Sequence, residues 1–501
     1  MVDYARMVEI VNGMLQARRH RHGDVTLFLD REGVARSTAY RWKEQVAWWL
    51  EAGPEELRRL SAELEEAREV VARSAREPSA AGLRDPAREL RFMAEGLTRG
   101  ISTANVAALL AVAGGRRVDA KTVERRVGKL ADAAPATFGC HFAGVGRVVA
   151  GDEVFLPGPL LMTVEPVSLL INGLRLADGR GAEDWKGVFA ALGDLERYVS
   201  DRGRGIVAAG QEAKVPGGAD QWHLLRPARQ AMGHLARTAY ASIGAEYGAR
   251  AALEAAREAK GEKAVRRARK AYAKARRVCK RAIAEFDRLE PLMANVTEAF
   301  AYVTPDGQVN TAGRAREQVR AVLAELGETK GGQRLAAKLS GLGDPLAFTH
   351  LEALAEGLDE VSLEETGAER ERTLARLVRE TEAWRRHDKT SVDALAEAAT
   401  SPTDRAEIEV IRAFDLAIRS SSYVECVNGR MRSVQVSRKH VGEKFLYLVA
   451  VHHNMTPFGR GSVRKGQSPA EWAGVVLPTN DWIELLERKA EELRTRAAQA
   501  G

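Results

Sequence analysis

Three short segments, far apart in the chain, each place a carboxylate beside an apolar run. They are 148–155, 198–203 and 420–430, and their acids are Asp152, Asp201 and Glu425. Carboxylate oxygens are the ligands that Mg²⁺ and other hard cations prefer. Two aspartates and a distant glutamate that converge could hold a pair of divalent ions for phosphoryl chemistry. We therefore expect these three carboxylates to meet.

Each acid alone also has an ordinary structural interpretation. Asp152 could lie on an edge strand and face water, and Asp201, followed by Arg-Gly-Arg-Gly, could cap a helix. Glu425 falls in a helical pattern in which Asn428, three residues further on, shares its face. An acid within an apolar strand is costly unless it is paired or metal-bound. The three segments are therefore more informative together than singly.

The composition is that of a globular protein with several domains. Of 501 residues, 45% are hydrophobic and 29% are charged, and the formal net charge is +7. A basic balance with local Arg/Lys clusters favours nucleic acid as a partner. Three cysteines without paired spacing argue against a disulfide framework or a zinc site. We see neither a signal sequence nor an apolar run of membrane-spanning length, so we expect a cytoplasmic protein without a membrane role.

The first fifty residues contain a candidate helix-turn-helix. A helix is expected to end at Gly33, and Ser37 can cap a second helix. The second helix of such a motif can enter the major groove of DNA. A two-helix corner without DNA-binding function is the alternative. The residues expected to contact DNA are Arg36, Tyr40, Arg41 and Lys43.

A second candidate of the same kind follows a charged amphipathic helix expected at 54–76. Residues 101–110 form a helical pattern, a Gly-Gly-Arg-Arg turn follows, and Asp119 can cap the next helix. Two such modules in series strengthen the expectation of DNA binding. The residues expected to contact DNA here are Arg116, Arg117, Lys121 and Arg125.

Between 145 and 225 the pattern changes to short apolar runs separated by turns. Strands are expected at 146–155, 160–164, 169–174, 196–200 and 221–225, with a helix at 182–192. This order predicts a mixed sheet that begins with antiparallel strands. Residues 226–420 are almost wholly helical in pattern.

The densest basic stretch, 257–281, holds twelve Lys/Arg against two Glu. It is either a solvated helix face or a surface for phosphates. Arg266, Arg269 and Lys270 represent it among the candidate DNA contacts, together with Arg430 and Arg432 near Glu425.

These segments resemble DDE-type transposases of bacterial insertion sequences. The resemblance is carried by Gly151-Asp152-Glu153, by Val199-Ser200-Asp201-Arg202-Gly203 and by the segment 420–432 around Glu425. It continues through 445–448, 453–458 and 466–471, and through the segment 221–225, which contains His223.

The resemblance implies an RNase H-like mixed-sheet catalytic core. Its expected activity is metal-dependent DNA cleavage and strand transfer, by a homo-oligomer that acts on transposon ends and target DNA at the nucleoid. Asp152 would bridge two Mg²⁺ or Mn²⁺ ions, with Asp201 and Glu425 each completing one site, and His223 and Asn428 would support them. The rivals are a non-catalytic DNA-binding regulator or domesticated transposase, and an RNase H-like nuclease without strand transfer.

Asp201 and Glu425 are 224 positions apart, so the resemblance implies a large all-helical insertion within the core. By analogy with transposases that carry such insertions, the basic helix would grip DNA. The expected organisation is a helix-turn-helix (1–53), a linker helix (54–90), a second helix-turn-helix (91–135), a first core part (140–228), the insertion (229–410), a second core part (411–478) and a C-terminal helix (479–501).

Overall fold

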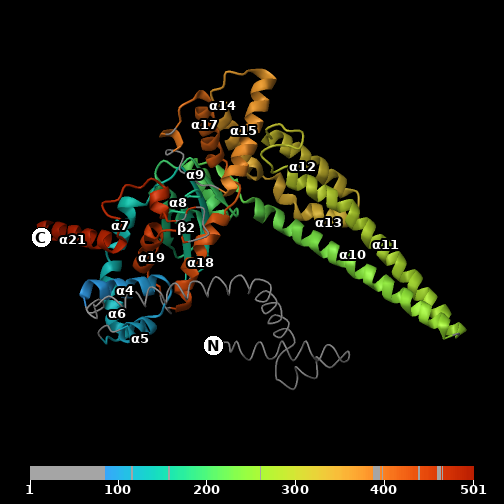
Figure 1. Cartoon of the computed structure of the whole chain (residues 1–501), viewed down its shortest axis with the longest axis horizontal. Helices are drawn as coiled ribbons and strands as arrows, with labels where there is room; N and C mark the ends of the chain where they lie inside the picture. Colours follow the sequence, from blue (N-terminus) through green and yellow to red (C-terminus); the bar gives the residue numbers. More distant parts are fainter. Residues whose placement is uncertain are drawn as a thin grey trace. The chain divides into compact units, whose positions relative to one another are not determined.

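The computed structural model describes residues 85–113, 117–155, 158–259, 261–387, 395–397, 399–437, 441–459, 464 and 466–500. The chain divides into two units, 1–88 and 89–501, and the second is described below (Figure 1). The first predicted helix-turn-helix, with Arg36, Tyr40, Arg41 and Lys43, lies outside the described residues. So do the helix predicted at 54–76 and Arg116.

A small mixed sheet forms the centre of this unit. Its strands are β1 (Val148–Phe155), β2 (Pro159–Val164), β3 (Ile171–Leu176), β4 (Arg197–Ser200) and β5 (Gly217–Ala219). The order is β3-β2-β1-β4-β5. The pairs β1–β2 and β2–β3 are antiparallel, whereas β1–β4 and β4–β5 are parallel. The expected mixed sheet with an antiparallel start is confirmed.

The strand expected at 221–225 is wrong. These residues open the helix α10 (Gln221–Glu258), because the Asp220 side chain caps it by accepting hydrogen bonds from the backbone N–H groups of Trp222 (2.6 Å) and His223 (3.1 Å). The last strand is instead β5, a Gly-Gly-Ala segment that lacks an apolar pattern.

Helices cover both faces of the sheet. On one face lie α8 (Ala182–Leu192) and α9 (Arg204–Ala213), whose Trp185 and Ile206 share a buried cluster with Val149 of β1. On the other face, α18 (Ser422–Ser437) packs against β1 and β2, and α19 (Glu443–Met455) packs against β3. Successive side chains of a strand point to opposite faces. Glu153 therefore faces α8 and Asp152 faces α18.

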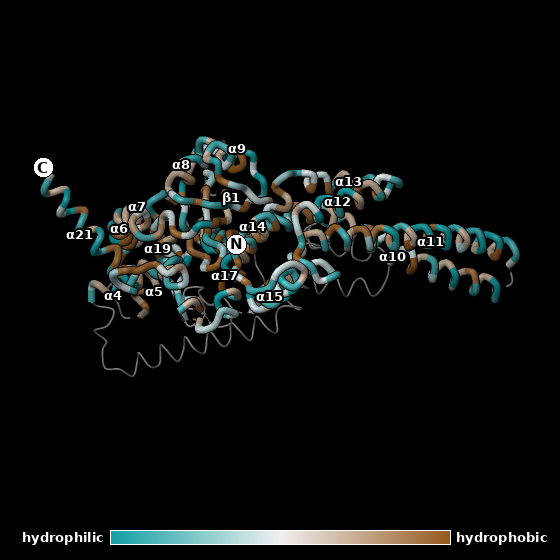
Figure 2. Tube along the Cα trace, turned by 90° about the horizontal axis from the view of Figure 1, so that it is seen from above, coloured by the Kyte–Doolittle hydropathy of each residue, from teal (hydrophilic) through white to brown (hydrophobic). Residues whose placement is uncertain are grey.

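The described residues between β5 and α18 are mainly helical and form a subdomain. It contains α10, α11 (Glu262–Glu298), α12 (Ala312–Gly327), α13 (Lys330–Lys338), α14 (Thr349–Asp359), α15 (Gly367–His387), α17 (Pro402–Leu416) and the short 3₁₀ helices η1 (Ser340–Gly343) and η2 (Pro345–Phe348). One buried cluster unites it, with Phe300, Phe348 and Leu351 at 0% exposure. The helices α10 and α11 form a long antiparallel hairpin, and α11 is predominantly hydrophilic (Figures 1 and 2).

The helices expected in the second helix-turn-helix are present. They are α5 (Thr103–Val112) and α6 (Ala120–Ala131), preceded by α4 (Pro86–Thr98) and followed by α7 (Ala134–His141). Asp119 caps α6 by accepting a hydrogen bond of 2.6 Å from the backbone N–H of Thr122. Near the end of the chain lie α20 (Pro469–Trp472) and α21 (Trp482–Ala500). Within the described residues, no helix combines the length and apolar character needed to cross a bilayer.

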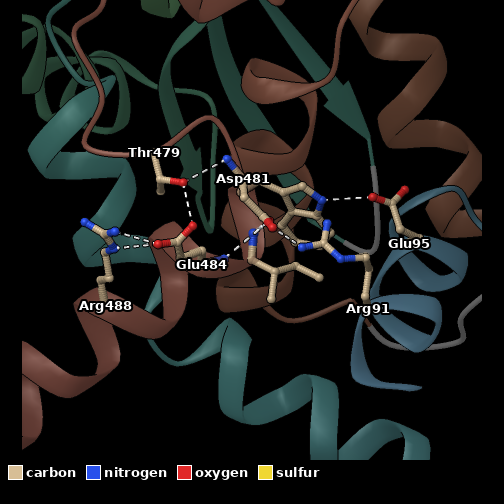
Figure 3. A network of polar contacts seen from close by, with 8 residues as sticks. Arg91, Glu95, Thr479, Asp481, Glu484 and Arg488 are labelled. Atoms are coloured by element: carbon tan, nitrogen blue, oxygen red, sulfur yellow. Dashed lines mark hydrogen bonds and ion pairs between the residues drawn. The ribbon is translucent and has the colours of Figure 1, made fainter. Parts of the chain in front are cut away.

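A polar network joins α4 to the start of α21 (Figure 3), and His452 of α19 also contacts it. Glu95 accepts hydrogen bonds from the indole of Trp482 (2.9 Å) and lies 3.1 Å from His452 Nε2, while Arg91 pairs with Asp481. Burial alone would raise the pKa of Glu95, but the contact with His452 and the bond from Trp482 hold it at about 2. The carboxylate of Glu95 thereby links α4 to two helices that lie far away in the sequence, α19 and α21.

We expect Glu95→Gln to destabilise the docking of α21 by about 1–3 kcal/mol at neutral pH, because hydrogen bonds to a charged acceptor are lost. The depressed carboxyl stabilises the fold fully above its ordinary pKa of 4.5 and loses this effect as pH falls towards about 2. The difference from the parent protein should therefore shrink over that interval. Amide hydrogen exchange in α21 measures it, and Glu491→Gln, which alters an exposed acid of the same helix, is the control.

Candidate active site

The strand register brings three aspartates into a row. The parallel pairing of β1 with β4 ends at Gly151 and Ser200, and that of β4 with β5 ends at Ser200 and Ala219. The next residues along the three strands are Asp152, Asp201 and Asp220. In open sheets, ligands bind beyond the carboxyl ends of parallel strands. The site therefore lies where the fold class alone would place one.

Two of these aspartates and a neighbouring glutamate form a compact acidic cluster. One ligand oxygen from each of Asp152, Glu153 and Asp201 lies within 4.8 Å of the others. Asp152 and Glu153 are partly buried, and Asp201 is exposed. A Cβ atom at Gly203 would approach Asp201 Oδ1 and Glu153 Oε1 to 3.3 Å. Glycine at this position therefore keeps the space beside the cluster open.

Glu153 was not among the predicted site residues. It points to the α8 face, where its Oε1 accepts a hydrogen bond of 3.3 Å from the indole of Trp185. Because successive side chains of a strand point to opposite faces, Asp152 and Glu153 diverge. Asp201 lies beyond the end of β4, where the carboxylates of both residues can approach it. Glu153 directly follows Asp152 in the sequence. No feature of the sequence alone distinguishes it from an acid on a strand that simply faces solvent.

Burial and mutual repulsion perturb the cluster. Desolvation raises the pKa of Asp152, the backbone N–H of Glu153 opposes this, and the negative charges of Asp201 and Glu425 raise it further, to about 6. Desolvation also raises the pKa of Glu153. A bound divalent cation would relieve this repulsion. An all-carboxylate donor set fits Mg²⁺ or Mn²⁺ better than zinc.

The turn after β4 holds Asp201 in place through an unusual backbone conformation. Arg202 adopts a φ of 71°, a left-handed conformation that is rare for a residue with a side chain. Its guanidinium pairs with Asp344 between η1 and η2, and its backbone N–H donates to Ser200 Oγ at 3.3 Å. The ion pair ties this turn to the helical subdomain.

The structure brings the helix of Glu425 against the cluster. Asn428 of α18 is fully buried, and its Nδ2 donates a hydrogen bond of 2.9 Å to Asp152 Oδ2. The Glu425 carboxylate is not one of the three ligands within 4.8 Å; it lies 3.4 Å from Arg432 Nη1 in an exposed pair. Its charge nevertheless raises the pKa of Asp152. Exposed pairs of this kind contribute little stability, so Glu425 is free to exchange this partner for another.

Asp220 joins the two ends of the helical subdomain. Besides capping α10, its carboxylate accepts hydrogen bonds from the backbone N–H (2.5 Å) and hydroxyl (2.6 Å) of Ser421. The backbone N–H of Gln221 donates to the carbonyl of Arg419 at 2.9 Å. The chain thus leaves the sheet and returns to it at the same point, and α18 starts beside β5.

The other predicted residues are exposed or lie beside the cluster. His223 Nδ1 lies 3.6 Å from Asp220 Oδ1; attraction to this carboxylate raises the pKa of His223, and the charges of Asp201 and Asp152 raise it further. The remaining candidates are solvent-exposed cations: Arg117, Lys121 and Arg125 at α6, Arg266, Arg269 and Lys270 on α11, and Arg430 and Arg432 on α18.

We expect Asp220→Ala to destabilise the junction between β5, α10 and α18 by about 1.5–3 kcal/mol or more, because several buried donors lose a charged hydrogen-bond acceptor. Hydrogen exchange in α18 should rise with that of the first turn of α10. Asp119→Ala removes the exposed cap of α6 and should cost only about 1 kcal/mol. Unchanged protection of α18 in Asp220→Ala would show that packing alone holds this helix.

No protein-family model matches this sequence, and a search of curated proteins found no match. The functional conclusion therefore depends on the geometry of the site.

Proposed function

We propose that this chain is a DDE-type transposase, which binds transposon ends and catalyses metal-dependent DNA cleavage and strand transfer. The observation that carries the proposal is the meeting of Asp152 and Asp201 where the parallel pairing of β1 and β4 ends, with a helix from more than 200 residues later hydrogen-bonded to Asp152. The resemblance assigned the same three segments to one active site. Their approach in space supports that assignment.

The architecture supports an RNase H-like core. Such a core has a mixed five-stranded sheet that begins with antiparallel strands, and the order β3-β2-β1-β4-β5 agrees with it. The helical subdomain enters and leaves beside Asp220, as expected for an insertion that leaves a compact core intact.

The donor set suggests a division of labour. Asp152, Glu153 and Asp201 would hold one divalent ion, and Asp152 with Glu425 would hold another. When bound, such ions activate a water or a 3′-hydroxyl and stabilise the leaving oxygen. Asn428 fixes Asp152 by donating to Oδ2, so that Oδ1 and Oδ2 keep a defined orientation. The exposed cations of α6, α11 and α18 would bind DNA phosphates.

We expect Asp152→Ala and Asp201→Ala each to reduce Mg²⁺-dependent DNA cleavage by about a thousandfold or more, since several kcal/mol of transition-state stabilisation are lost. The substrate is a plasmid that carries the gene together with the DNA that flanks it on both sides. Asp194→Ala, at an exposed aspartate before β4, is the control.

The products of the same assay separate the alternatives. Cleaved ends joined to target DNA are expected for a transposase. Cleavage without joining would identify a nuclease, and DNA binding without any cleavage by the parent protein would identify a regulator.

We further expect the two glutamates to differ in metal binding. Glu425→Gln should reduce the number of bound Mn²⁺ ions from two to one, because Glu425 stands outside the compact cluster. Glu153→Gln should weaken the tighter ion, because its carboxylate lies within that cluster. Titration followed by electron paramagnetic resonance measures both. Equal effects of the two substitutions would contradict this division.

A further inference from the structure

One face of α10 carries a stripe of exposed aromatic and basic side chains that the proposed mechanism does not use. Its members recur at helical spacing: Trp222, Arg226, Arg229, Gly233, Arg237, Tyr240, Gly244 and Tyr247. At about 100° per residue they fall within roughly 80° of arc. This α10 stripe lies away from the buried side of the helix, which holds Leu225, Met232 and Ala239.

The aromatic side chains of the α10 stripe are unusually exposed to solvent. Trp222, Tyr240 and Tyr247 are 45%, 74% and 68% exposed. Isolated exposed aromatic residues need no explanation, but three on one face with three arginines form a pattern. From Gln221 to Tyr247 the only acid is Glu246, and it does not lie on this face. The surface is therefore positive as well as aromatic.

The first half of the stripe is hollowed. A shallow depression of about 510 Å³ is lined by Trp222, Arg226, Arg229, Gln230, Gly233 and Arg237. The guanidinium of Arg226 lies over the Trp222 ring, 4.6 Å from its centroid. Because Gly233 has no side chain, planar groups can approach the helix backbone closely there.

The stripe begins beside the carboxylate cluster. The backbone N–H of Trp222 donates to Asp220 Oδ1 at 2.6 Å, and Asp220 follows β5 at the register where Asp201 follows β4. From Trp222 the stripe extends about 37 Å along the helix at 1.5 Å per residue. A polymer that leaves the cluster past Trp222 would follow α10.

We propose that the α10 stripe binds a single strand of DNA next to the active site, with bases stacked on Trp222, Tyr240 and Tyr247. The three arginines pair with its phosphates. This inference rests on the proposed function, since DNA rather than RNA is the expected polymer. A single strand fits better than a duplex because exposed rings can stack only on unpaired bases. Arginine supplies both charge pairing and cation–π contact.

Binding of the full-length chain to labelled oligothymidine, and to a duplex of equal length, tests the inference in EDTA, where metal-dependent cleavage is absent. Trp222→Ala should weaken oligothymidine binding by about tenfold, the effect of one lost stacking contact, and duplex binding by less than twofold. Tyr240→Ala/Tyr247→Ala should act in the same direction. Tyr240→Phe/Tyr247→Phe, which keeps both rings, should restore binding.

The arginines have a separate readout. Arg226→Ala/Arg229→Ala/Arg237→Ala should reduce the salt dependence of oligothymidine binding by about two in the log–log slope. The matched control, Arg372→Ala/Arg376→Ala/Arg379→Ala on α15, removes the same charge and should leave the slope unchanged. Equal losses for duplex and single strand, or no loss, would overturn the inference even if the parent protein cleaves DNA. Failure of the parent protein to bind any DNA would refute the proposed function itself.

Discussion

The site depends first on the carboxylate of Asp220. It accepts hydrogen bonds from the first turn of α10 and from Ser421 at the start of α18. The start of α10 and the start of α18 are about two hundred residues apart in the chain. Without a shared anchor, nothing in the sequence would keep them close in space. Because both ends are fastened to one buried side chain, the subdomain can be large without displacing α18 from β1. Asn428 then meets Asp152 because α18 is held at this end.

Asp152, Asp201 and Asp220 follow the points where the parallel pairing of β1, β4 and β5 ends, yet their surroundings give them different roles. All follow from the same register, yet Asp220 has a pKa of about 2 and Asp152 one of about 6. Burial disfavours the charged form of both. Hydrogen bonds from His223 and Ser421 compensate at Asp220, whereas Asp152 faces further negative charge. Hydrogen bonds from the protein therefore stabilise the charge of Asp220, whereas a cation bound beside Asp152 would stabilise the charge there.

The sequence predicted those parts of the core that have a strong local pattern. The apolar runs before Asp152 and Asp201 predicted β1 and β4. The parallel register of these two strands then places the two acids side by side. Neither β5 nor Asp220 was recognised, because Gly-Gly-Ala has no hydrophobic periodicity and the first turn of α10, directly after Asp220, was predicted as a strand. The segment around Glu425 was singled out by its pattern, but only the resemblance joined it to an aspartate 224 positions earlier, since no local signal reports which distant segments pack together. The role of Glu153 became apparent only from the structure, in which its carboxylate lies close to Asp201, the residue after β4.

Asp220 also couples the helical subdomain mechanically to the site. The residues that it caps, Trp222 and His223, begin both α10 and its exposed stripe. Any movement of the first turn of α10 away from β5 must break hydrogen bonds to the same carboxylate that holds Ser421. A ligand can favour one arrangement only by binding it more tightly than the alternatives. A strand bound along α10 beside Trp222 would meet that condition, because it contacts the turn whose position also determines where α18 begins.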